Sequence, residues 1–186
     1  MVVQNPPHLY TFEDFQQFIA LPENEDRLFE LINGEISEVS PGRTSNSEYR
    51  DLIAFAVRVF CHEHKLPCHT SGEGGAYRVQ ESVVAPDFAY KRTPMSKEYP
   101  DPVAPLWAVE IISPTDKAKD IRDKRKVYRQ AGILLWEIYP ESMSVDVYAP
   151  GKELQEFDIN DVLNVGDILP GFTLPVRDIF VDPLAE

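Results

Sequence analysis

One apolar stretch of the chain carries an acidic residue where none is expected. Residues 106–112 are hydrophobic apart from Glu110, a pattern typical of a strand buried on both faces. A carboxylate in such a strand must be paired, hydrogen-bonded or bound to a metal, because an isolated buried charge is very costly. Pro114 ends the run soon afterwards, since proline cannot continue a β-ladder. Glu110 is therefore the first candidate for chemistry.

A second acidic residue interrupts another expected strand, residues 82–90. Pro86 and Asp87 lie in its middle. Carboxylates on neighbouring strands can converge on one hard cation, such as Mg²⁺ or Mn²⁺, because these ions prefer oxygen ligands. Such a cation polarises a phosphoryl oxygen and lowers the pKa of its bound water. Asp87 and Glu110 thus predict metal-dependent hydrolysis of a phosphodiester.

The segment after Pro114 is expected to form a helix that supplies a lysine. Ile121, Lys124 and Tyr128 recur at spacings of three and four, which is typical of one helix face. Lys124 therefore shares the inward stripe, whereas Lys126 projects roughly 200° away. Near the metal, Lys124 could orient the attacking water or stabilise the developing charge. The expected limits of this helix are Thr115 or Asp116 as the N-terminal cap and Gly132 as the stop.

Elements earlier in the chain are expected to position these residues. Thr11 is predicted to cap a short helix, with Asp14 as its capping-box partner. Asn33-Gly34 is a strong hairpin signal and joins expected strands at 28–32 and 35–39. A longer helix is expected from Ser47 to about His64, with a buried stripe formed by Leu52, Phe55, Ala56, Val59 and Phe60.

Further elements follow from turn signals and alternation. Residues 72–75, Gly-Glu-Gly-Gly, are expected to form a hairpin loop. Residues 133–139 and 144–149 are predicted to be two more strands. These elements together predict an α/β fold: a mixed sheet carrying Asp87 and Glu110, flanked by helices, with a β-hairpin before the core.

Two more carboxylates are secondary candidates for the site. Glu30 lies on the expected hairpin and could approach the metal, although an exposed strand position is the more common place for a glutamate. Glu48 lies near the start of the long helix, where a negative charge also favours the helix through its dipole.

Composition limits the class of protein. With 186 residues, 43% of them hydrophobic, the chain is expected to form one domain. The lack of a long apolar run or signal-peptide pattern predicts a cytoplasmic protein.

The net charge of −13 opposes nonspecific attraction to nucleic acid. Residues 115–130, however, contain seven basic residues and three acidic ones. This segment is either a local face for a phosphate backbone or a solvated helix surface.

Several short motifs follow one another in a fixed order: Pro86-Asp87, Glu110, Ser113-Pro114, Asp120, Lys124, Tyr128 and Ala131-Gly132. In this order they resemble the Uma-type family of predicted endonucleases, a branch of the PD-(D/E)XK restriction-endonuclease-like superfamily. Residues 27–35 are similar to the opening segment of that family, and residues 169–172 to its closing segment. The resemblance covers nearly the whole chain.

The resemblance implies a restriction-endonuclease-like fold and Mg²⁺- or Mn²⁺-dependent cleavage of DNA. It implies that Asp87, Glu110 and the backbone carbonyl of Ile111 hold the metal. Ile112 occupies the position of the superfamily lysine, and the Uma-type pattern implies that Lys124 replaces it. The family often carries a histidine near the start of its first long helix, where this chain has residues 46–49, Asn-Ser-Glu-Tyr. Homodimers are common in the superfamily, so a homodimer is plausible.

Two other functions remain open from the sequence. A catalytically inactive member of the family, retained as a binding or assembly module, would be consistent with the acidity, with Ile112 and with the missing histidine. A metal-dependent phosphoesterase acting on small nucleotides would also suit an acidic protein. Duplex and mononucleotide substrates would distinguish the nuclease from the phosphoesterase.

Overall fold

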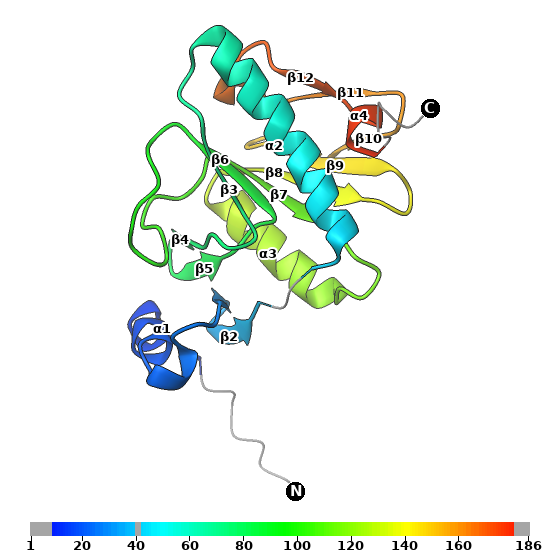
Figure 1. Ribbon diagram of the computed structural model, residues 1–186. Helices are drawn as coiled ribbons and strands as arrows, with labels where there is room; N and C mark the ends of the chain where they lie inside the picture. Colours follow the sequence, from blue (N-terminus) through cyan, green and yellow to red (C-terminus); the bar gives the residue numbers. More distant parts are fainter. Residues whose placement is uncertain (1–8, 40–41, 181–186) are drawn as a thin grey trace, which may run out of the picture.

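The computed structural model describes residues 9–39 and 42–180 (Figure 1). Its largest sheet is six-stranded and mixed, in the order β10-β9-β8-β7-β6-β3. The strands of this sheet are β3 (His69–Gly72), β6 (Phe88–Lys91), β7 (Trp107–Ile111), β8 (Leu134–Tyr139), β9 (Ser144–Tyr148) and β10 (Gln155–Phe157). A mixed sheet flanked by helices confirms the predicted α/β class.

The centre of the sheet is a β7-α3-β8 unit. Strands β7 and β8 are parallel, with Trp107 opposite Leu134 and Ile111 opposite Ile138. Parallel neighbours require a crossover connection, which α3 (Ala118–Gln130) provides. Because this pair lies in the middle of the sheet with both faces covered, every residue of β7 is buried. Glu110 is therefore held inside the protein, as its apolar neighbours predicted.

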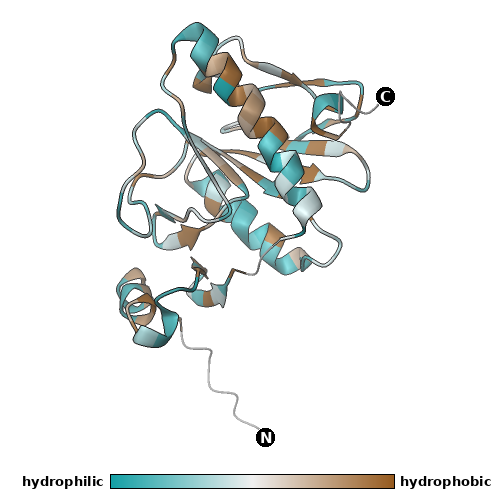
Figure 2. Ribbon diagram, in the orientation of Figure 1, coloured by the Kyte–Doolittle hydropathy of each residue, from teal (hydrophilic) through white to brown (hydrophobic). Residues whose placement is uncertain are grey.

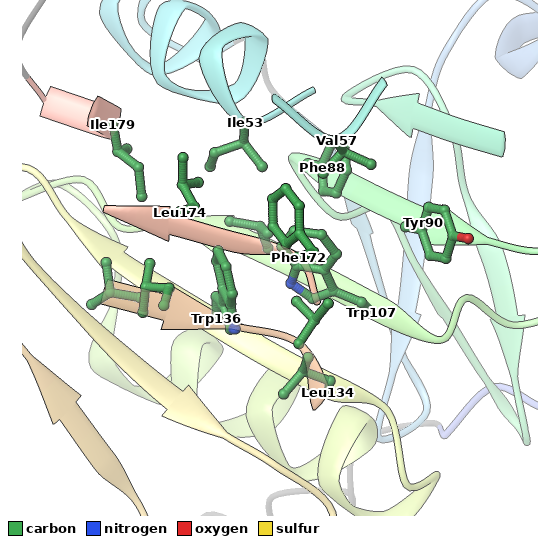
Figure 3. Close-up of a cluster of buried hydrophobic side chains, with 14 of the residues drawn as sticks. Ile53, Val57, Phe88, Tyr90, Trp107, Leu134, Trp136, Phe172, Leu174 and Ile179 are labelled. Carbon is green, nitrogen blue, oxygen red and sulfur yellow. The ribbon is translucent and has the colours of Figure 1, made fainter. Parts of the chain in front are cut away.

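Helix α2 (Thr44–His64) crosses one face of the sheet, and α3 covers the other (Figure 1). The core on the α2 side is completed by the C-terminal elements, whose Phe172, Leu174 and Ile179 pack with Trp107 and Trp136 (Figure 3). These elements are β11 (Val162–Asn164), β12 (Thr173–Pro175) and α4 (Arg177–Phe180). On the other face, Tyr128 and Val127 of α3 pack on Ala108 of β7. Alternate residues of β7 thus point to different helices, and Glu110 shares the α3 side with Ala108.

A second, four-stranded sheet has the order β2-β1-β5-β4 and contains the predicted hairpin. Asn33 and Gly34 both have positive φ, 52° and 78°, as a tight hairpin turn of this type requires. Helix α1 (Phe12–Ile19) packs beside it, and the predicted capping box is present, since Thr11 and Asp14 bond each other's backbone. The strands are β1 (Phe29–Ile32), β2 (Glu35–Glu38), β4 (Tyr77–Val79) and β5 (Ser82–Val84).

The expected strand at 82–90 is in fact two strands in different sheets. Strand β5 belongs to the four-stranded sheet and β6 to the six-stranded sheet, and Pro86-Asp87 is the break between them. For the same reason residues 72–75 are not a hairpin loop: β3, before them, pairs with β6, whereas β4, after them, pairs with β5. Pro86-Asp87 thus lies at a junction between the two sheets.

The buried stripe predicted for α2 is wrong in part: Ala56 and Phe60 do pack against the core, but the predicted stripe is not the buried face. The buried residues are Ile53, Val57 and Cys61, whereas Phe55 is 70% exposed and Val59 is 38% exposed. Apolar residues occupy almost every position through the middle of this helix, the brown stretch of α2 in Figure 2. A pattern that is apolar nearly all round has no unique inward face, so periodicity could not select the correct one.

The limits of the two long helices also differ from the expected ones. Helix α2 begins at Thr44 rather than Ser47. Lys117 precedes α3 without capping it, while Asp116 accepts a hydrogen bond from the Ser113 amide, so neither Thr115 nor Asp116 is the cap. Gly132, with φ 69°, ends the helix as predicted. Within the described residues, no helix is both long and apolar enough to cross a membrane.

Candidate active site

Asp87 and Glu110 lie side by side where β6 and β7 meet. Phe88, the residue after Asp87, is paired with Val109, the residue before Glu110. The Asp87 carboxylate accepts a hydrogen bond from the Ile111 amide through Oδ2, at 2.6 Å. This bond fixes Asp87 against the strand that carries Glu110. The two carboxylates that the sequence singled out are therefore brought together.

Helix α3 places two side chains on Glu110. Lys124 Nζ lies 3.3 Å from Glu110 Oε2, and the Tyr128 hydroxyl donates to Oε1 at 2.6 Å. These residues are four apart, so they share one face of the helix. Lys126, by contrast, points to solvent. The inward stripe predicted for Lys124 and Tyr128 is observed. Ile112, at the position of the superfamily lysine, donates its amide to the carbonyl of Ile138.

Glu30 joins the same cluster, and its interpretation as a solvent-facing strand residue is wrong. It is 7% exposed, because β1 is an inner strand between β2 and β5. Its Oε1 accepts a hydrogen bond from the Ala85 amide at 2.7 Å and lies 2.9 Å from Lys124 Nζ. Lys124 consequently bridges Glu30 and Glu110 across the two sheets.

Burial and crowding of negative charge perturb the pKa values of these carboxyls. Burial raises the pKa of Glu110 to about 8, with Asp87 and Glu30 adding to the rise and Lys124 opposing it. Burial likewise raises the pKa of Asp87 to about 6, against the Ile111 hydrogen bond and the charge of Lys124. The pKa of Lys124 is raised, because the attraction of Glu110 and Glu30 outweighs its own desolvation. Such perturbation is typical of functional sites.

A further acidic residue was missed by the sequence reasoning. Glu73 follows β3 and is near enough to Asp87 to raise its pKa, and it accepts a hydrogen bond from Ser47 Oγ at 3.1 Å. Ser47 is one of the four residues that stand where the family often has a histidine. The only signal in the sequence of this segment was its Gly-Glu-Gly-Gly composition, which a turn explains without any functional role for Glu73.

Glu48 does not enter the cluster. It is exposed on α2, where it lines an open hollow with other residues of the first two turns of the helix. Its neighbour Ser47 is the residue that faces the site, through Glu73. The position of Glu48 therefore does not support a role as a metal ligand.

The donor set fits a hard divalent cation in chemistry and in charge. Glu30, Asp87 and Glu110 carry three negative charges when ionised, against the single positive charge of Lys124, and oxygen is the donor that Mg²⁺ prefers. Asp87 accepts the Ile111 hydrogen bond through Oδ2, and Glu30 contacts the Ala85 amide and Lys124 through Oε1. In the described part of the chain, however, no three His, Cys, Asp or Glu side chains already converge as a ligand set. An ion here would need backbone or water ligands besides Asp87 and Glu110.

The raised pKa values predict that metal-free protein becomes less stable as pH rises from 5.5 to 8. In this window Asp87 and Glu110 keep protons in the folded state that they lose when unfolded, so the free energy of unfolding falls. We expect a fall on the order of 2 kcal/mol, by the general relation of about 1.4 kcal/mol per pKa unit, measured by urea denaturation in EDTA. Glu110→Gln should flatten the profile; an equally steep profile in that variant would contradict the assignment.

Comparison with known proteins gives a structural relative and a family. A putative nuclease belonging to DUF820, from Anabaena variabilis ATCC 29413, superposes with a TM-score of 0.77 at 21% sequence identity, covering 91% of this chain and 97% of that one. No match was found among curated proteins. Residues 13–177 match the Uma2 family, described as "Putative restriction endonuclease". The chain therefore belongs to the Uma2 family and has the nuclease-like fold of its structural relative.

Proposed function

We propose that this protein is a Mg²⁺- or Mn²⁺-dependent endonuclease that hydrolyses phosphodiester bonds of DNA. The observation that supports it most is the convergence of Asp87, from the residue before β6, with Glu110 of β7 and Lys124 of α3. Membership of the Uma2 family, described as restriction endonucleases, supports the reaction class. Asp87, Glu110 and the Ile111 carbonyl are the proposed metal ligands.

The bound ion would polarise a phosphoryl oxygen and lower the pKa of its water. The residues of the chain have distinct roles around it. Tyr128 holds Glu110 in place through its hydroxyl, and burial keeps that hydroxyl protonated, because the pKa of Tyr128 is raised well above its usual value. The Ile111 amide holds Asp87.

Lys124 has the role of orienting the attacking water or neutralising charge on the phosphate. Without a ligand it is paired with Glu30 and Glu110. Glu30 is itself anchored by the Ala85 amide, so it can hold the lysine beside the site when Glu110 takes a metal. Glu30 is in this proposal a positioning residue for Lys124.

Calorimetry with Mg²⁺ and Mn²⁺, followed by cleavage of supercoiled plasmid, tests this function. We expect metal binding of millimolar affinity and plasmid cleavage that EDTA abolishes. A wild type that binds neither ion, even with an oligonucleotide present, would leave the inactive binding module as the better account. Hydrolysis of mononucleotide esters without cleavage of duplex would instead support the small-nucleotide phosphoesterase, which the net charge of −13 favours.

A further inference from the structure

The outer face of α2 carries an apolar strip with an acidic and a basic residue along one side of it. Phe55 is 70% exposed and Val59 is 38% exposed, and Leu52 is partly exposed one turn before Phe55. Asp51 is paired with Arg50 of the same helix at 3.1 Å, yet its side chain is 66% exposed and open to a second cation. Arg58 is also exposed. Exposed apolar side chains in a contiguous strip mark interaction sites more often than scattered ones do.

We propose that this face of α2 pairs with the same face of a second copy, antiparallel, about a two-fold axis beside Phe55. This inference is independent of the nuclease chemistry proposed above. A two-fold interface requires a surface that is complementary to itself. The order of residues along α2 meets that requirement.

The geometry of an α-helix predicts which apolar side chains of the two copies meet. At roughly 100° per residue, Leu52 and Val59 lie at about +60° and +40° around the helix from Phe55. A two-fold axis perpendicular to the helices reverses chain direction but keeps each residue on its own side. Leu52 therefore faces the partner's Val59, on both sides of a central contact between the two Phe55 rings.

The charged residues lie on the other side of the strip. Asp51 and Arg58 are at about −40° and −60° from Phe55 by the same rule, so Asp51 faces the partner's Arg58. Two such ion pairs form, one on each side of the axis. The Arg58 guanidinium is already held by Thr70 Oγ1, with contacts of 3.0 and 2.8 Å, which reduces the entropy lost when it is paired.

The ends of the strip are complementary as well. Glu48 and His62 are each seven residues from Phe55, within about 20° of its direction. Glu48 lines an open hollow of about 620 Å³ on the first turns of α2, and His62 lines another of about 520 Å³ between α2 and β3. The antiparallel arrangement places Glu48 of one copy near His62 of the other, where the imidazole N–H can donate a hydrogen bond to the carboxylate. With 21 residues, α2 is about 31 Å long, enough for such a contact to run along the helix.

Sedimentation velocity over a concentration series tests the interface. We expect the wild type to form dimers, and Phe55→Asp to weaken dimerisation at least about 100-fold, as loss of a central aromatic contact does. Leu154→Asp, which changes a 43% exposed leucine outside α2, is the matched control and should dimerise normally. A wild type that is monomeric throughout, or Phe55→Asp dimers of normal affinity, would overturn the proposal.

A charge exchange tests the orientation of the two helices. Asp51→Arg and Arg58→Asp should each weaken the dimer about tenfold, because each removes two exposed ion pairs and creates like-charge contacts. The double variant restores both pairs with the charges exchanged, so its affinity should recover. Circular dichroism of all variants confirms the fold. Failure of the double variant to recover would exclude the antiparallel register.

Discussion

Glu110→Gln and Asp87→Asn should each abolish detectable Mg²⁺ binding and lower the rate of DNA cleavage at least about 1,000-fold. A metal is worth several kcal/mol of transition-state stabilisation, and each factor of ten in rate corresponds to about 1.4 kcal/mol. Both substitutions keep the size of the side chain and one carbonyl oxygen, so the hydrogen bonds from Tyr128 and Ile111 can persist. The measurements are calorimetric titration with Mg²⁺ and single-turnover cleavage of labelled duplex.

Stability separates loss of a ligand from loss of the fold in these variants. Because removing a charge from a crowded acidic cluster relieves repulsion, we expect neither variant to unfold more readily at pH 8 without metal. Glu141→Gln, at an exposed position, is the matched control and should bind and cleave as the wild type does. Normal Mg²⁺ affinity in both Asp87→Asn and Glu110→Gln would disprove the proposed ligand set.

Lys124→Met should reduce both cleavage and stability. Removing one partner of a largely buried ion pair leaves an uncompensated charge and typically costs about 3 kcal/mol or more, and Lys124 is the partner of both Glu30 and Glu110. The free energy of unfolding should therefore fall by about 3 kcal/mol at pH 8. At pH 5.5, where Glu110 is protonated because its pKa is near 8, the loss should be smaller.

The control for Lys124 lies two residues further along the same helix. Lys126→Met removes a lysine whose side chain is 66% exposed and forms an ion pair with Asp123. We therefore expect little change in stability or cleavage. Urea denaturation at both pH values and single-turnover kinetics with saturating Mg²⁺ are the readouts. If Lys124→Met cleaves DNA at the wild-type rate, the lysine has no catalytic role, whatever its effect on stability.

Local sequence patterns were sufficient to predict several elements of the structure. The Asn33-Gly34 turn, the capping box of Thr11 and Asp14, and the stop at Gly132 depend on backbone conformations that a few neighbouring residues determine. Glu110 was identified for a similar reason, since a carboxylate within an apolar run must have a partner wherever that strand lies. The inward position of Lys124 followed from the periodicity of one helix.

Other features depended on which elements lie side by side. Residues 82–90 were expected to form one strand interrupted at Pro86-Asp87, but they form two strands in different sheets, because the two halves pair with different distant segments. The exposed face of α2 was mispredicted, because its middle is apolar nearly all round and only the packing of Ile53, Val57 and Cys61 against the sheet selects the inward side.

The sequence by itself determined which residues are the candidates for chemistry: Asp87, Glu110 and Lys124 could be named from burial, spacing and family resemblance. Only the tertiary structure decided what surrounds them. Glu30 and Glu73 come from segments whose own sequences look like an exposed hairpin and a glycine turn, and they reach the cluster because β1 pairs with β5 and β3 pairs with β6. Such contacts depend on long-range pairing, which local propensity does not encode.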